Sequence, residues 1–189
     1  MSGGTVTNNA NAYCRLIVGS GNSSGEMLQS GGSFVQGQGV VRVGWRGGIG
    51  LYRFTGGTTD FSNCDFHVGL DGGKGTLEIG AGAGTLTSKN LFFDGENAVL
   101  KFKPGENGSL AKLNVTTMFT VASDAKLVVD ASEYKGIKPV DLMTFAAKDG
   151  SFAEENVEII APRLSSFRVL QQANRIRLIV KKGFTMSIK

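Results

Sequence analysis

The chain has 189 residues, of which 41% are hydrophobic and 19% charged, a composition that can form a packed core and excludes wholesale disorder. Its formal net charge is +4, and the surplus lies in the second half: residues 1–99 hold six Lys or Arg and seven acids, and the remainder hold fourteen and nine. So small a surplus does not favour nucleic-acid binding. No apolar run approaches the about 20 residues of a membrane-spanning helix, so we expect no membrane insertion.

The first residues, MSGGTVTNN, carry neither the basic start nor the apolar stretch of a signal peptide. Met1 and Ser2 lie directly before the GGT of the first repeat described below. We therefore expect the chain to be a piece of a longer repeat protein.

A regular sequence repeat organises the first half. The segment VGWRGGIGLYRFTGGT begins at Val43, and similar glycine-rich segments begin one period earlier at Val18 and one period later at Val68. Each repeat holds three short stretches in which apolar and polar residues alternate, the pattern of β-strands. Repeats of this length indicate stacked units that share one core. The sequence therefore predicts an all-β fold, a right-handed parallel β-helix of about four to five coils with about 25 residues each.

Alignment of the repeats places like residues in columns. The predicted inward columns are Leu16, Val41, Phe66 and Leu91; Val18, Val43, Val68 and Phe93; Met27, Tyr52 and Leu77; and Val6, Phe34, Thr59 and Leu86. The outward columns are mixed, and one of them places Arg53 over Glu78, a pair of opposite charges that suits an exposed ladder.

The repeat loosens near residue 100. The segment LFFDGENAVLKF shortens one turn by about two residues, and glycine falls from 23 residues before position 100 to five after it. From Leu110 the sequence predicts longer strands, the last of them FTMSI at residues 184–188, and one helical turn in SFAEENV capped by Ser151. We therefore assign β-solenoid repeats to residues 1–109, and terminal coils with a β-sandwich-like, mostly antiparallel C-terminal cap to residues 110–189. A cap is expected because open strand edges invite pairing.

The rhythm GG[TS]…VG..GG.G…L.I, which covers residues 3–103, resembles the autotransporter-associated β-strand repeats and related surface β-solenoids of bacterial passenger-type proteins. The segments VDLMTFA and RIRLIVKKG are similar to the closing strands of such proteins. The resemblance implies an extracellular or cell-surface location. It implies architecture more than activity, because these solenoids serve as adhesins, stalks and enzyme scaffolds alike.

The glycine-rich turns match no ligand-binding motif. GLDGGKGT lacks the GxxxxGK[ST] spacing and the following helix of a phosphate-binding loop. Tyr52 and Leu77 stand where a calcium-binding repeat would place carboxylates. We therefore expect no cofactor and predict structural turns, with glycine supplying positive φ, at Gly44, Gly47, Gly48, Gly50, Gly69, Gly72, Gly73 and Gly75.

Candidate catalytic groups are sparse. His67 is the only histidine, which excludes a multi-histidine metal centre, and its outward column predicts a solvated ring near Asp65. Asp60, Asp65, Asp71 and Glu78 belong to one repeat but to different faces or turns. An inverting pair of carboxyl groups about 6.5–9.5 Å apart across a groove is the catalytic alternative. Scattered surface charge is the favoured interpretation.

Two surfaces are candidates for contact with glycans or polyanions. Trp45 and Arg46 protrude from a predicted turn, where an indole could stack on a sugar ring, with local packing over the coil edge as the simpler alternative. In the last strands, basic residues alternate with apolar ones and would share one strand face: Arg168, Arg175, Arg177 and Lys181. A solvated outer face with edge-protecting charges explains the same pattern.

The sequence thus favours a non-catalytic structural or adhesive β-solenoid module of an extracellular or cell-surface bacterial protein. Its expected partners are further repeats of a parent chain, or a second copy stacked head to tail on the uncapped first coil. The alternative is a carbohydrate-active β-helix enzyme or a glycan-binding module, which needs a groove lined by clustered polar side chains.

Overall fold

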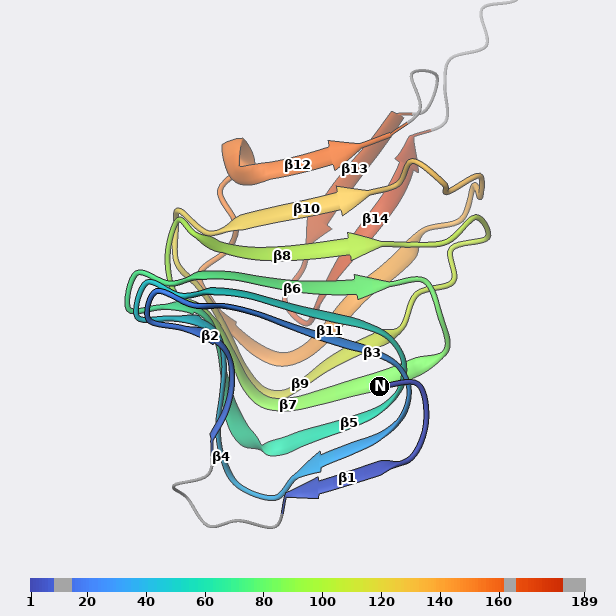
Figure 1. Ribbon diagram of the computed structural model, residues 1–189. Helices are drawn as coiled ribbons and strands as arrows, with labels where there is room; N and C mark the ends of the chain where they lie inside the picture. The colour runs from blue at the N-terminus through green and yellow to red at the C-terminus, as the bar shows by residue number, and fades with distance from the viewer. Residues whose placement is uncertain (9–14, 162–165, 182–189) are drawn as a thin grey trace, which may run out of the picture.

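The computed structural model describes residues 1–8, 15–161 and 166–181, and it confirms the predicted all-β fold with 68% strand and 2% helix. Parallel strands form a β-solenoid of about six turns, and antiparallel strands follow at the C-terminal end. Figure 1 shows the coils stacked on one another, with β1 at one end and β12, β13 and β14 at the other. The described strands are β1 (Thr5–Asn8), β2 (Arg15–Ser20), β3 (Ser24–Gln36), β4 (Gly39–Trp45), β5 (Ile49–Leu70), β6 (Lys74–Gly80), β7 (Gly84–Phe93), β8 (Ala98–Lys103), β9 (Lys112–Val121), β10 (Lys126–Asp130), β11 (Val140–Asp149), β12 (Val157–Ile160), β13 (Ser166–Gln171) and β14 (Arg175–Lys181).

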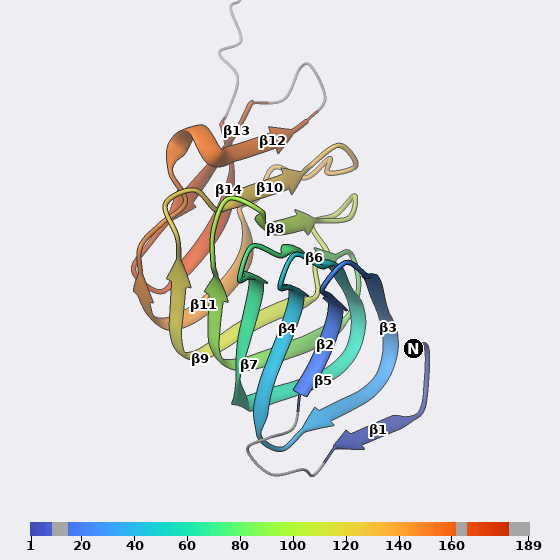
Figure 2. The same ribbon diagram turned by 60° about the vertical axis from the view of Figure 1, so that its left-hand side comes forward.

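Each coil contributes to three parallel sheets, here called sheets I, II and III. Sheet I contains β1 and residues 33–36, 57–61, 84–88, 112–115 and 144–145. Sheet II contains β2, β4 and residues 64–70, 90–93, 118–121 and 147–149, and its strands lie side by side in Figure 2. Sheet III contains residues 24–29 and 49–54 with β6, β8, β10 and β12. The long strands β3, β5, β7, β9 and β11 therefore bend at the corners and pass from one sheet to the next.

The strand registers give the length of each coil. Val18 pairs with Val43, which is the offset that the sequence repeat predicts. Gly75 pairs with Ala98 at an offset of 23, which confirms the predicted two-residue shortening. Later coils lengthen until β10 pairs with β12 at an offset of 30. The parallel ladder thus continues to β12, and the coils number about six rather than the predicted four to five. The prediction was too low because the later coils differ in length and lack the glycines that mark the repeat.

The predicted inward columns form the core, except that Val6, in the first coil, is 46% exposed. The registers place Leu16, Val41, Phe66 and Leu91 in one row, and Val6, Phe34, Thr59 and Leu86 in another. Aromatic rings fill the space between the rows: the Phe61 centroid lies 5.3 Å from that of Phe34 and 5.8 Å from that of Phe66. Each such buried side chain contributes about 1.5–3 kcal/mol, so the coils are held together by burial as well as by backbone hydrogen bonds.

One polar cluster lies inside this core. The Tyr52 hydroxyl donates to Gln29 Oε1 over 2.8 Å, and the Thr59 hydroxyl donates to the same oxygen over 2.7 Å. All three side chains belong to residues that are at most 1% exposed. Burial raises the pKa of Tyr52 well above that of a free tyrosine, so its hydroxyl remains a donor. We call this group the polar triad.

The predicted glycine turns lie at the corner between sheets II and III. Gly44 and Gly69 have φ angles of 69° and 79°, which favour glycine. A Cβ atom on Gly44 would lie 2.3 Å from the carbonyl oxygen of Lys74 in the next coil. Of the other predicted turn glycines, Gly47 and Gly72 also have positive φ angles, whereas Gly48, Gly50, Gly73 and Gly75 do not. Glycine therefore lets the backbones of successive coils pack directly on one another.

The antiparallel part of the described chain is a single hairpin. β14 pairs with β11 and β13 pairs with β14, both antiparallel, so the hairpin extends sheet I beyond the last coil. Ile176 and Leu178 of β14 are 1% and 0% exposed and pack on the core. Among the described residues, the predicted antiparallel cap is therefore formed by this hairpin. The predicted helical turn is present at Glu154–Asn156, but its N-cap is Ala153, because the Ser151 hydroxyl donates to the preceding carbonyl instead.

Candidate functional site

Trp45 lies at the corner between sheets II and III. Its Nε1 donates to Asp71 Oδ2 of the next coil over 2.9 Å. The guanidinium carbons of Arg42 and Arg46 lie 4.3 and 4.2 Å from the ring centroid, within the range of cation–π attraction. Arg46 has a φ angle of 50° and so turns back toward the ring. A sugar that stacked on Trp45 would have to displace a guanidinium group.

Positive charge gathers around this ring in a group that we call the arginine cluster, Arg15, Arg42 and Arg46. The pKa of the Arg42 guanidinium is lowered mainly by burial and further by the charges of Arg15 and Arg46, while Asp71 opposes the shift. The buried Nε and Nη1 of Arg42 have no hydrogen-bond partner in the described part of the chain. The cluster is therefore a local excess of positive charge, which attracts anions.

His67, on the outer face of sheet II, is held by contacts with the next coil. Its Nδ1 lies 2.9 Å from Asp94 Oδ2, and its ring stacks on Phe92 with centroids 4.5 Å apart. A carboxylate that fixes one ring nitrogen and orients the other is an arrangement suited to a general base. Sequence reasoning named Asp65 as the neighbour and missed Asp94, because Asp94 begins the turn in which the repeat loses its period.

The other acidic residues of this repeat are dispersed, as predicted. Asp65 Oδ1 accepts a hydrogen bond from Asn90 Nδ2 over 2.8 Å on sheet II. Asp60 lies on sheet I and its Oδ1 accepts from the backbone N–H of Ser62 over 2.9 Å, as in a local turn. Asp71 lies at the Trp45 corner. The structure therefore gives these carboxylates separate partners on separate faces.

Glu78 lies on the outer face of sheet III, where the predicted row of Arg53 over Glu78 is confirmed. Its two carboxylate oxygens lie 2.8 Å from Arg53 Nε and 3.3 Å from Lys101 Nζ. Glu78 is only 7% exposed, because its neighbours cover it. This row of alternating charge links three successive coils and acts as a structural ladder.

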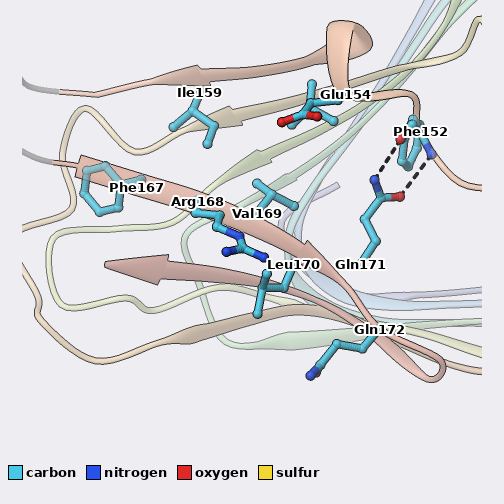
Figure 3. Close-up of a pocket in the computed structure, with 10 residues that line it drawn as sticks. Phe152, Glu154, Ile159, Phe167, Arg168, Val169, Leu170, Gln171 and Gln172 are labelled. Carbon is cyan, nitrogen blue, oxygen red and sulfur yellow. Dashed lines mark hydrogen bonds between the residues drawn. The ribbon is translucent and has the colours of Figure 1, made fainter. Parts of the chain in front are cut away.

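A groove of about 570 Å³, which we call the end groove, separates β12 from β13 at the C-terminal end of the solenoid. It is lined by Phe152, Glu154, Val157, Ile159 and the six consecutive residues 167–172. Figure 3 shows Ile159 and Val169 pointing into the gap from its two sides, while Arg168 lies on the other face of β13. Gln171 ties β13 to Phe152: its side chain donates to the Phe152 carbonyl over 2.8 Å and accepts from the Phe152 N–H over 3.0 Å.

One carboxylate, that of Asp141, partly offsets the charge of the predicted basic face of the last strands. Arg168, Arg175 and Arg177 share one face of the hairpin, as the register of β13 on β14 requires. Asp141 of β11 lies 2.5 Å from Arg177 Nε and 3.5 Å from Arg175 Nη1. The hydrogen bond from Arg177 lowers the pKa of Asp141, and Asp141 raises the pKa of Arg177. Arg168 makes no ion pair with a described residue, and the side chain of Lys181 lies outside what the structure describes.

A second cavity, of about 620 Å³, lies beside sheet I and is lined by residues 107–108, 110, 112–114, 134 and 138–144. Tyr134 is 3% exposed and its hydroxyl donates to the Lys138 carbonyl. A β-bulge between Asp141 and Met143 shapes the opposite wall. An apolar cavity of this size with a polar rim can hold a small ligand. Sequence reasoning missed it, because its lining comes from β9, β11 and the loops that precede them, where the sequence has no repeat.

Among the described residues, no group of three or more His, Cys, Asp or Glu is arranged to hold a metal ion. The described part of the chain also contains no helix long and apolar enough to cross a membrane. Comparisons with protein-family models, curated proteins and solved structures found no match. The β-solenoid assignment therefore depends on the structure alone.

Proposed function

We propose that the chain is a non-catalytic structural or adhesive module, a rigid β-solenoid rod of an extracellular or cell-surface protein. The observation that carries the proposal is the continuous stack, in which three parallel sheets share about six coils and one core. Bending or stretching such a stack breaks hydrogen bonds on three sides at once. The surface location and the kinship with autotransporter-associated repeats are supported by the GG[TS] rhythm of residues 3–103.

The alternative of a carbohydrate-active enzyme is tested by incubation with a panel of acidic and neutral polysaccharides. New reducing ends and unsaturated products are measured over time. The structural proposal expects neither. Product that forms with the native chain and is lost in His67→Ala would overturn it, because the His67–Asp94 pair is the best-placed general base on the outer faces. Antibody labelling of intact cells of the source organism tests the surface location.

The module associates through its N-terminal end. A hollow of about 470 Å³ there is lined by residues 16–20 and 23–27, including the apolar Leu16, Val18 and Met27. β2 and residues 24–27 of β3 have no strand neighbour on this side in the described chain, whereas Met1 bonds to the backbone of Leu28 and Ser30. The opposite end is crossed by the β13–β14 hairpin, so head-to-tail stacking of two copies would require that hairpin to move. A further coil of a parent chain fits the N-terminal end, and a second copy fits it by meeting end to end with the same surface.

Sedimentation at rising concentration tests this association. We expect a reversible dimer that Met27→Lys weakens, because the substitution places a charge in the N-terminal hollow. Leu28→Lys is the matched control, since Leu28 is 46% exposed and points outward from the same strand. A chain that stays monomeric at every concentration contradicts association between copies.

Polyanion binding at the arginine cluster is the second candidate function. The observation in its favour is that three arginines, Arg15, Arg42 and Arg46, gather near Trp45 and that Asp71 offsets only part of their charge. Retention on an immobilised acidic glycan should fall with salt and with Arg46→Ala. It should change little with Arg175→Ala, because Arg175 lies on β14 of the C-terminal hairpin and outside the arginine cluster. Equal losses in the two variants would argue against a site at the cluster.

A further inference from the structure

The cavity of about 620 Å³ beside sheet I, here called the side cavity, lies where two neighbouring strands separate. In the described chain the register of β11 on β9 begins at Thr144 opposite Asn114, and no earlier residue of β11 pairs with β9. The side cavity is lined by both strands before this point, by residues 112–113 of β9 and by the consecutive residues 140–143 of β11. Successive residues of a strand point to opposite faces. The side cavity therefore enters the sheet between the two strands rather than resting on its outer face.

Two loops that bond to each other form the mouth of the side cavity. The backbone N–H of Lys135 donates to the Glu106 carbonyl over 2.9 Å, and Lys135 Nζ lies 2.8 Å from Glu106 Oε1. The Tyr134 hydroxyl closes the second loop through its bond to the Lys138 carbonyl. The loops also pack closely, because a Cβ atom on Gly108 would lie 3.1 Å from the Tyr134 ring. A site that is formed before its ligand arrives spares the binding free energy the cost of ordering loops.

The interior of the side cavity is apolar. Leu113, Leu142 and Met143 line it and are at most 2% exposed, so they form its floor. Leu110 is half-buried and Pro139 is exposed, so both present apolar surface to a ligand. The volume lies within the range of small-molecule sites, about 300–1,000 Å³. The side cavity therefore suits the apolar chain or ring of a small molecule.

The charged groups at the rim favour an anion. Lys112 and Lys138 line the side cavity, are exposed and form no ion pair with a described residue. Asp141 is the one acidic residue of the described lining, and it is held by Arg177 and Arg175. The charge of this carboxylate is therefore offset by two guanidinium groups, whereas the charges of the two lysines are not offset. Local positive charge of this kind attracts anions.

We propose that the side cavity binds a small amphipathic acid, a carboxylate that carries an apolar chain or ring. The apolar part enters the space between β9 and β11, and the carboxylate lies at the rim beside Lys112 and Lys138. Asn114 supplies a further donor, because its Oδ1 accepts the Thr144 hydroxyl over 2.6 Å and its Nδ2 makes no hydrogen bond with a described residue. Hydrogen bonds to an ionised group are stronger than neutral ones. The inference is independent of the proposed rod function, which requires no ligand.

Isothermal titration calorimetry of the full chain tests the proposal with two probes, decanoate for the chain and 2-naphthoate for the ring, each below its aggregation concentration. We expect saturable binding of at least one acid. The matched alcohol, decanol or 2-naphthol, lacks the charge and should bind at least about tenfold more weakly. Absence of saturable binding by both acids would overturn the proposal. Equal affinity for an acid and its alcohol would also overturn it, because the rim charges would then play no part.

The two exposed lysines allow a variant that leaves the core unchanged. In Lys112→Gln with Lys138→Gln, the dissociation constant of the bound acid should rise at least about tenfold. The matched control is Lys89→Gln with Lys126→Gln, which removes two exposed lysines outside the cavity and should bind the acid as the native chain does. Equal losses in the two variants would overturn the site, because attraction by net charge would explain both.

A location measurement does not depend on a variant. A decanoate or naphthoate that carries a photoreactive diazirine should label residues 107–114 or 134–144, as read by mass spectrometry of the digested chain. Labels confined to other segments would overturn the proposal.

Discussion

Alanine at Gly50 should destabilise the solenoid far more than alanine at Gly72. A Cβ atom on Gly50 would lie 2.1 Å from the carbonyl oxygen of Val18, whereas ordinary contact begins at 3.4 Å, so the coils must move apart there. Gly50 does not have a positive φ angle, so this effect is purely steric. Gly72 is the opposite case, with a φ angle of 73° and no atom within 4 Å of its added Cβ.

The expected magnitudes follow from these two geometries. A left-handed residue other than glycine costs about 1–2 kcal/mol, which is the whole expected effect of Gly72→Ala. A shift large enough to relieve the overlap at Gly50 breaks the backbone hydrogen bonds of the corner, three of which have N–O distances of 3.0–3.1 Å around Trp45 and Ile49. At about 1 kcal/mol for each bond, Gly50→Ala should cost about 3 kcal/mol or more.

Urea unfolding followed by far-UV circular dichroism and by the fluorescence of Trp45 measures both free energies of unfolding. Gly44→Ala combines a positive φ angle with a steric overlap and should be at least as damaging as Gly50→Ala. Equal effects at Gly50 and Gly72 would refute the reasoning. The coils would then not touch at this corner, and the glycines would need another explanation, such as a ligand that approaches the backbone.

Three further predictions concern the polar groups. Glu78→Gln should lower the free energy of unfolding in urea by about 1–2 kcal/mol, because Arg53 and Lys101 lose their common partner. Glu106→Gln, in the exposed pair with Lys135, should cause no measurable change in the same assay. Arg177 lowers the pKa of Asp141 in the folded chain, so this pair stabilises the fold at pH values above about 3.9, the pKa of an unfolded aspartate. That stabilisation is lost as the pH falls through the lower pKa that Asp141 has in the folded chain. Asp141→Asn should flatten the thermal stability profile on the acid side of that unfolded pKa. Tyr52→Phe should lower the free energy of unfolding in urea by about 1 kcal/mol, because Gln29 Oε1 loses the Tyr52 donor and keeps the Thr59 donor. An unchanged urea midpoint would show that the triad does not stabilise the fold.

The first coils could be predicted from sequence, because their side chains obey a strict period. The constant offset that pairs Val18 with Val43, and Val43 with Val68, specifies which residues share a row, which of them face inward and where the backbone must turn. The charge row through Glu78 followed from the same alignment. The later coils vary between offsets of 23 and 30, so no single period could identify them.

The candidate sites were predicted less completely, because they depend on contacts between segments without a repeat. Trp45 and Arg46 were placed correctly at a turn, but the approach of Arg42 to the ring depends on side-chain packing. Asp94 escaped the alignment because it lies where the period changes. Arg177 and Asp141 form an ion pair although they are 36 positions apart in the sequence. Nothing in the sequence around either residue indicates this pair.

The polar triad has a consequence for the order in which the coils assemble. Coils that share the same offset are nearly interchangeable, so a chain displaced by one whole coil would still match glycine to glycine and valine to valine. If the coil that holds Gln29 paired with the coil one further along, Leu77 would take the place of Tyr52 and Leu86 that of Thr59. Gln29 would then bury its Oε1 without these two donors, at a cost of about 1–3 kcal/mol. Three polar atoms in the interior thus specify which two coils pair, and they disfavour the alternative stack without any contribution from the outer faces.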